Sequence, residues 1–160
     1  LHPLVAVPRG SAGPAALRGA WMALAGDPVV EALASALGAQ TFRVADDHRV
    51  AYHASAAIAA NHLVALLGQA ERVAGGAGVP TEAIMSLAEG ALAGAARVGT
   101  AEALTGPVAR GDWPTVAAHL AALAPDERPA YEALARQALR LAWPTIRAAT
   151  DEGSAPPWRS

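Results

Sequence analysis

The sequence predicts a mainly α-helical protein that begins with a short strand–helix–strand segment. Alanine supplies much of a hydrophobic content of 53%, whereas aromatic residues make up only 4%. Alanine is the strongest helix former, and its small side chain lets helix axes approach closely. From residue 46 to residue 67 the chain also contains neither proline nor glycine. We therefore expect a helical bundle over residues 46–150.

Residues 1–45 are expected to be the end of an α/β unit. Three short β-prone segments occur at residues 4–7, 21–24 and 41–44. Between the second and third, Asp27 and Pro28 favour a helix start and Gly38 favours a helix end. Strand, helix and strand with short links are typical of a crossover in a parallel sheet. These strands are too few to form a domain alone.

Four helices are predicted after this segment. The first starts at Asp46 or Asp47 and runs to about residue 74, and the second spans about residues 81–98. A loop at residues 99–111 precedes a helix over residues 112–123, which Asp112 can cap. The last helix begins near residue 125, with an apolar stripe at Tyr131, Leu134, Ala138 and Leu141. Pro144 should kink or end it, and residues 151–160 should form a disordered tail.

Charge and cysteine content exclude several functions. A net charge of -2 provides no basic field for nucleic acid or for an anionic membrane surface. The sequence has no lysine and no cysteine, which excludes Schiff-base chemistry, disulfides and thiol nucleophiles from these residues. A cysteine-free chain without a signal peptide suits the cytoplasm. Because the chain does not begin with Met, we expect it to be cut from a longer protein.

Residues 50–70 carry no formal charge and are numerous enough to cross a bilayer as a helix. Polar side chains nevertheless interrupt this stretch, among them His53, Asn61, His62 and Gln69. Polar groups are costly in lipid, and alanine contributes little to insertion. We therefore expect a helix buried in protein, with no membrane partner.

His53 and Asn61 are the most informative polar residues of this helix. A separation of eight residues places them about 80° apart around an α-helix and about 12 Å apart along it. They can therefore line one groove and contact a single extended ligand, although they cannot hydrogen-bond each other. The alternative is that both are polar residues satisfied inside a helix bundle.

Two other candidate sites are weaker. The first consists of side chains of metal-ligating type, namely Asp46, Asp47, His48, His53 and His2. No tight pair such as HExxH occurs among them, so no metal site is predicted.

The loop around Arg110 is the second of these candidates. Arg110 offers a guanidinium fork for a carboxylate or phosphate. Gly106, Pro107 and Gly111 could equally shape a plain connection before the next helix. No glycine-rich dinucleotide fingerprint is present in the sequence.

Three phrases together resemble a known family. They are residues 1–4 (LHPL), residues 49–56 (RVAYHASA) followed by Asn61, and residues 103–112 (ALTGPVARGD). Their order and spacing resemble bacterial oxidoreductase-like proteins in which a helical domain of unknown function follows a Rossmann-like domain. That family is similar to pyrroline-5-carboxylate reductase, ketopantoate reductase and 6-phosphogluconate dehydrogenase. The resemblance covers nearly all of residues 1–150 and implies a bundle like the C-terminal domain of 6-phosphogluconate dehydrogenase.

The resemblance also implies a function. NAD(P) would be bound mainly by an N-terminal domain absent from this chain, and these residues would supply substrate binding and a homodimer interface. His53 matches the position that meets the substrate opposite the nicotinamide, with Asn61 further along the same helix as the second catalytic residue. His2, Thr105 and Arg110 would bind the substrate. The dehydrogenases usually have lysine where His53 stands, so the identity of the general acid stays open.

The sequence thus predicts the C-terminal half of an NAD(P)-dependent oxidoreductase that acts on a small carbonyl or imine acid and is inactive as this fragment. One alternative is a non-catalytic dimerisation or regulatory helical module. Another is a helical bundle that binds a small molecule alone. A G-x-G-x-x-G strand–turn–helix in the preceding part of the gene would favour the oxidoreductase.

Overall fold

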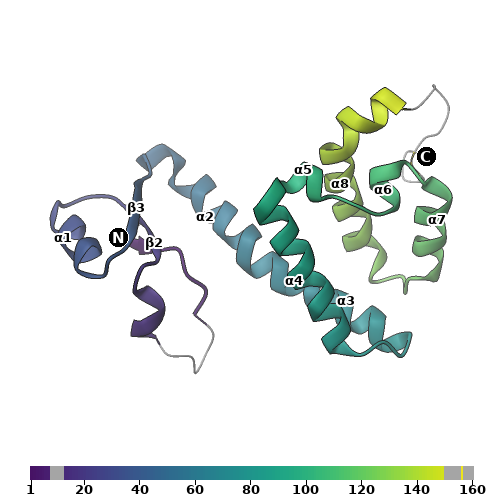
Figure 1. Cartoon of the computed structure of the whole chain (residues 1–160), viewed down its shortest axis with the longest axis horizontal. Helices are drawn as coiled ribbons and strands as arrows, with labels where there is room; N and C mark the ends of the chain where they lie inside the picture. The colour runs from purple at the N-terminus through teal and green to yellow at the C-terminus, as the bar shows by residue number, and fades with distance from the viewer. Residues whose placement is uncertain (8–12, 150–155, 157–160) are drawn as a thin grey trace. The chain divides into compact units, whose positions relative to one another are not determined.

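A computed structural model describes residues 1–7, 13–149 and 156 of the chain. The residues divide into two compact units, Leu1–Leu66 and Leu67–Ser160 (Figure 1). The chain changes from strands to helices near residue 46, as expected. The first compact unit nevertheless extends to Leu66, so it includes the strands and the first helical residues after them. The predicted disorder of residues 151–160 lies outside the described residues, Pro156 aside.

The first unit contains a three-stranded sheet in the order β1-β2-β3. Strands β2 (Trp21–Leu24) and β3 (Gln40–Arg43) are parallel, and α1 (Val29–Ala36) joins them, which confirms the predicted crossover. A short 3-10 turn, η1 (Pro14–Leu17), precedes β2. Met22, Leu24 and Ala34 form the buried centre of this α/β segment. The mainly helical fold with a small strand-containing start is thus confirmed.

The first strand lies earlier than predicted. β1 (His2–Pro3) pairs antiparallel with β2, His2 opposite Ala23 and Pro3 opposite Met22. The backbone N–H of Leu4 then donates to the carbonyl oxygen of Trp21 at 2.8 Å. Because Trp21 is the first residue of β2, no strand residue remains for residues 5–7 to pair with, and they leave the sheet despite their β propensity.

One helical stretch, Asp46–Gly76, follows the sheet. It consists of η2 (Asp46–His48), α2 (Arg49–Ala57), a π turn η3 (Ile58–His62) and α3 (Leu63–Gly76) in direct succession. By length and composition alone this stretch could cross a membrane, and its most apolar window is not buried in the described chain. The expectation that protein buries this helix stays a prediction, since the described residues do not bury that window.

Within its described residues, the second unit continues with helices only. They are α4 (Thr81–Val98), α5 (Thr100–Ala103), α6 (Pro107–Arg110), α7 (Trp113–Ala122) and α8 (Arg128–Ala149). The predicted starts of α4 and α7 are confirmed, and the Asp112 side chain caps α7 by accepting from the Thr115 backbone N–H at 3.2 Å.

Three sequence expectations in this unit are corrected. Residues 99–111 contain the two short helices α5 and α6 rather than a plain loop. Gly99 precedes the first and Gly106 the second, and both glycines have a positive φ. α8 continues through Pro144 to Ala149 rather than ending there. Its buried face carries Ala135, whereas Leu134 and Leu141 are exposed.

The core of the second unit lies where α6, α7 and α8 meet. Val108, Trp113, Val116 and Ala135 are buried there. A polar contact joins α3 to the turn before α8: the amide of Gln69 donates to the Glu127 carbonyl oxygen at 2.8 Å, and Arg72 donates to both carboxylate oxygens of Glu127. This contact holds the pKa of Glu127 below its usual value, because Arg72 and Gln69 donate hydrogen bonds to it and Arg72 is positively charged.

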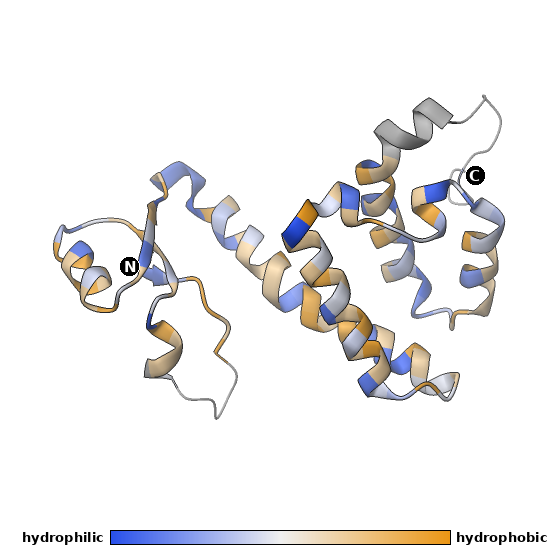
Figure 2. Cartoon of the chain, in the orientation of Figure 1, coloured by the Kyte–Doolittle hydropathy of each residue, from blue (hydrophilic) through white to orange (hydrophobic). Residues whose placement is uncertain are grey.

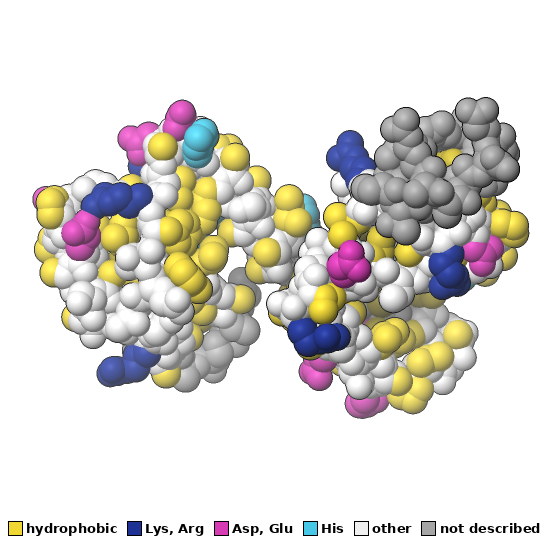
Figure 3. Space-filling model, turned by 45° about the horizontal axis from the view of Figure 1, so that its top comes forward, with side chains coloured by type: hydrophobic (Ala, Val, Ile, Leu, Met, Phe, Trp, Pro, Cys, Tyr) yellow, Lys and Arg dark blue, Asp and Glu magenta, His cyan; other side chains and the backbone are white. Residues whose placement is uncertain are grey.

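Much apolar surface stays uncovered in the described chain. No residue of α4 is buried, and the side chains of Leu87 and Leu92 are 71% and 61% exposed. On the preceding helical stretch Val50 is 82% and Val64 is 69% exposed. Figure 2 shows hydrophobic residues along α3 and α4, and Figure 3 shows hydrophobic side chains at the surface of both units. Apolar area of this extent is typical of an interaction face.

Candidate functional site

A pocket of about 410 Å³ opens beside His2 and His53 in the first unit. Residues 2–6 line one side, and side chains of α2 and η3 from Tyr52 to Asn61 line the other. We call it the histidine pocket. It brings together three of the predicted site residues: His2 from the start of the chain, and His53 and Asn61 from one helical stretch, about two turns apart. No charged carboxylate or guanidinium lines it among the described residues.

The π turn sets the register of this wall. Asn61 lies inside η3, whereas His53 lies on α2 before it. A π turn holds more residues per turn than an α turn, so side chains inside it follow one another at smaller angles than the roughly 100° of an α-helix. The 80° offset expected for an uninterrupted α-helix therefore does not apply, and both side chains line the pocket. Single π turns inside α-helices occur frequently at functional sites.

Neither polar side chain is engaged elsewhere. His53 and Asn61 are exposed, and among the described residues neither has a hydrogen-bond partner. The alternative in which both groups are satisfied inside a bundle therefore does not hold within this chain. Both remain available to a ligand.

A row of rings leads from the sheet to this pocket. Trp21 of β2 lies 6.2 Å from Phe42 of β3, and Phe42 lies 5.6 Å from Tyr52 of α2, between ring centroids. The Tyr52 ring meets that of His2 edge-on at 5.5 Å, and the His2 ring lies 6.0 Å from that of His53. Edge-to-face ring pairs at such distances are favourable. The row fixes His2 and the start of α2 to the sheet.

Tyr52 orients His2 through a hydrogen bond. Its hydroxyl lies 2.8 Å from Nδ1 of His2. Burial raises the pKa of Tyr52 above its ordinary value of 10.0, so the hydroxyl keeps its proton at neutral pH. When Tyr52 donates this proton to Nδ1, the neutral imidazole carries its own proton on Nε2. His2 can then donate to a ligand through Nε2.

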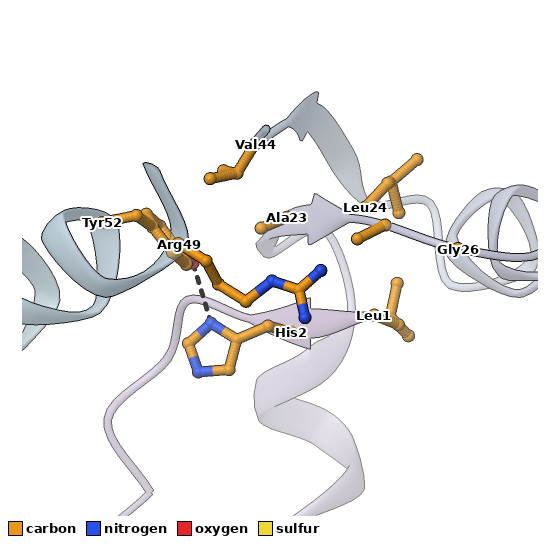
Figure 4. Close-up of a pocket in the computed structure, with 9 residues that line it drawn as sticks. Leu1, His2, Ala23, Leu24, Gly26, Val44, Arg49 and Tyr52 are labelled. Carbon is orange, nitrogen blue, oxygen red and sulfur yellow. Dashed lines mark hydrogen bonds between the residues drawn. The ribbon is translucent and has the colours of Figure 1, made fainter. Parts of the chain in front are cut away.

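A second pocket of about 350 Å³ lies on the other side of His2 and Tyr52. It opens at the carboxyl ends of β2 and β3, beside Leu24 and Val44, and we call it the strand-end pocket. Arg49 reaches from α2 across it, and the bond between His2 and Tyr52 borders it (Figure 4). Arg49 also donates to the Asp46 carboxylate within the same helical stretch.

Thr105 and Arg110 belong to the second unit. Thr105 is exposed between α5 and α6, and Arg110 is the exposed last residue of α6. Asp112 follows two residues later, and hydrogen bonds from Thr115, first among the causes, hold its pKa below the usual value. Asp112 is therefore a charged helix cap, and the guanidinium of Arg110 is open to solvent.

Sequence reasoning missed Tyr52, Phe42 and Arg49 as site residues. Tyr52 and Arg49 stand within four residues of His53, so a search of the neighbouring helical turn could have included them. Phe42 carries no such signal, because only the sheet register brings it to Tyr52. The suggested metal ligands do not assemble: no group of three or more His, Cys, Asp or Glu side chains able to hold a metal occurs in the described part of the chain.

Comparisons with known proteins agree with this fold. A family model described as a domain of unknown function, DUF2520, matches residues 22–138. Protein TM1727 from Thermotoga maritima is 25% identical with a TM-score of 0.69, over 79% of this chain and 54% of that chain. A "putative NADP oxidoreductase BF3122" from Bacteroides fragilis is 23% identical with a TM-score of 0.61, over 69% of this chain and 44% of that chain.

The chain spans about half the length of these solved structures. No curated protein matches it. The expected membership in a family of domains of unknown function is confirmed. The solved structures show that the fold is shared, and the association with a Rossmann-like domain stays a prediction. The narrower relation to pyrroline-5-carboxylate reductase, ketopantoate reductase and 6-phosphogluconate dehydrogenase stays a prediction.

Proposed function

The chain belongs to the DUF2520 family, and we propose that it is the substrate-binding and dimerisation half of an NAD(P)-dependent oxidoreductase. The substrate would be a small carbonyl or imine acid. The observation that carries this proposal is the convergence of His2, His53 and Asn61 on one pocket. The fold shared with a protein described as an NADP oxidoreductase supports it.

The nicotinamide nucleotide would be held by residues outside this chain. The sequence lacks the glycine-rich strand–turn–helix that cradles a pyrophosphate. The histidine pocket instead offers what a substrate needs, namely two imidazoles and a carboxamide beside small alanine side chains. When bound, the dihydronicotinamide would supply a hydride to the carbonyl or imine carbon.

The residues of the pocket would supply the proton and the orientation. His53 would donate a proton to the substrate oxygen or nitrogen, because its exposed imidazole lines the pocket and can act as a general acid. Asn61, about two helical turns further along, would hold the substrate. His2, oriented by Tyr52, would donate a second hydrogen bond. The expected substrate contacts of Thr105 and Arg110, which lie in the second unit, stay a prediction.

The test uses the full-length protein and follows NAD(P)H oxidation with a panel of 2-oxo and imino acids. His53→Ala should lower turnover by about 10²–10⁴-fold, the usual contribution of general acid catalysis, and leave cofactor affinity nearly unchanged. His62→Ala is the matched control, because His62 is exposed on the same helical stretch and does not line the pocket. Full turnover by a folded His53→Ala variant would refute the assignment.

The homodimer is a further part of the proposal. The uncovered apolar side chains of α4 and of the helical stretch before it, including Leu87 and Val64, support association with a second copy of the chain. Burying such area against a second copy contributes roughly 25 cal/mol per Å². The same observation favours the second candidate function, a non-catalytic dimerisation module.

Sedimentation at tens of micromolar tests the dimer, and turnover separates the two functions. A dimer that oxidises no NAD(P)H with any acid would favour the non-catalytic module. Leu87→Glu should shift the equilibrium toward monomer, because it places a charge on the proposed interface. Glu82→Gln on the same helix is the control. A monomeric wild type at these concentrations would contradict the interface.

A further inference from the structure

The strand-end pocket offers a charge that the histidine pocket lacks. Arg49 is the one charged side chain among the nine residues that line it, and its other walls are mostly apolar. No carboxylate lines it among the described residues. We propose that this pocket binds the carboxylate of a small 2-oxo or 2-imino acid through Arg49. The proposal rests on the proposed function and names the residue that anchors its substrate.

Arg49 is free to accept this partner. Its ion pair with Asp46 joins side chains that are 59% and 88% exposed. Exposed pairs of this kind contribute little, because water and salt screen them. A guanidinium carries five N–H donors in a planar fork and can bind a carboxylate through two of them. A ligand carboxylate can therefore share Arg49 with Asp46 or replace it.

The position of the pocket also favours a ligand. It opens at the carboxyl ends of the parallel strands β2 and β3, between Ala23 to Gly26 on one strand and Val44 after the other. Ligands of open α/β sheets bind outside this edge. Gly26 adopts a φ of 85° there, which keeps the turn after β2 narrow and free of a side chain.

The shared wall of the two pockets restricts the substrate class. His2 and Tyr52 line both pockets, so an acid anchored at Arg49 has its neighbouring atoms beside the His2 imidazole. In a 2-oxo or 2-imino acid the reacting carbon is directly bonded to the carboxylate carbon. The carbonyl or imine carbon therefore lies one bond from the anchored carboxylate, in a pocket that His2 and Tyr52 also line.

The experiment measures binding without cofactor or turnover. Saturation-transfer NMR on the full-length protein follows the methyl signal of pyruvate, and pyruvamide serves as the uncharged probe of similar shape. Pyruvate should bind, and Arg49→Gln should weaken it about three- to tenfold, the effect of a charge-assisted hydrogen bond reduced by solvent exposure. Arg49→Lys should retain part of the affinity. Arg43→Gln should retain all of it, because Arg43 pairs with Glu31 and lines neither pocket.

Three results would overturn the inference: no detectable binding of pyruvate to the wild type, equal binding of pyruvate and pyruvamide, or unchanged pyruvate binding in a folded Arg49→Gln variant. If inorganic phosphate competes with pyruvate as well as acetate does, the pocket is a general anion site. That result would also contradict the inference. Arg49-dependent binding in a protein that never oxidises NAD(P)H would refute the proposed function and leave this inference standing.

Discussion

Removing the Tyr52 hydroxyl tests whether His2 is held in place. Tyr52→Phe keeps the ring and its edge contacts with Phe42 and His2 but deletes the 2.8 Å hydrogen bond to Nδ1 of His2. A hydrogen bond contributes about 0.5–1.5 kcal/mol net to stability. Because His2 is exposed and Tyr52 only half-buried, water can replace part of the bond. We therefore expect a loss of about 0.5–1 kcal/mol in the free energy of unfolding.

Tyr52→Ala separates the ring from the hydroxyl. It removes the hydrogen bond together with two edge-to-face contacts, each worth about 0.5–1.5 kcal/mol. The expected total is about 1.5–4 kcal/mol. Urea unfolding followed by tryptophan fluorescence measures both variants, and an unchanged m-value shows that only stability has changed.

A double-mutant cycle of Tyr52→Phe with His2→Ala isolates the hydrogen bond. The coupling should equal about 0.5–1 kcal/mol. The second unit provides a matched pair, since His119 and Tyr131 have the same atoms 2.8 Å apart. Tyr52→Phe and Tyr131→Phe share no partner and should be additive. A coupling between His2 and Tyr52 within about 0.2 kcal/mol of zero, with both single variants folded, would refute the reasoning about His2.

Two further predictions concern the second unit. The free energy of unfolding should fall as the pH drops below the ordinary Glu pKa of 4.5, because the folded state holds the pKa of Glu127 lower and the unfolded chain takes up its proton first. In urea titrations Glu127→Gln should make this fall shallower, whereas the control Glu82→Gln should not. An identical dependence of the free energy of unfolding on pH in the wild type and both variants would contradict the role of the Arg72 contact. Trp113→Ala should cost about 3–5 kcal/mol, because this side chain is only 7% exposed in the core of α6, α7 and α8. Calorimetry checks this value, and a loss below about 1 kcal/mol would show that the core is not packed around Trp113.

Sequence by itself determined the parts of the fold that depend on neighbouring residues. Asp112 caps α7 and Pro80 precedes α4 as expected, because a cap needs only the backbone N–H groups of the next turn. The β2–α1–β3 crossover followed from two β-prone segments around a helix of a few turns. The placement of His53 and Asn61 along one groove was also predictable, and both line one pocket, although the spacing argument assumed an uninterrupted α-helix.

Tertiary structure decided what lies opposite these residues. Periodicity could not reveal the π turn, which depends on how the helix is held rather than on a residue pattern. Nor could it bring Tyr52 to His2, fifty positions away, or place Arg49 over the ends of β2 and β3. Such contacts depend on strand register and packing, which no local hydrogen bond specifies. The sequence therefore indicates which side chains can carry chemistry, and the sheet and its ring contacts determine which of them share a pocket.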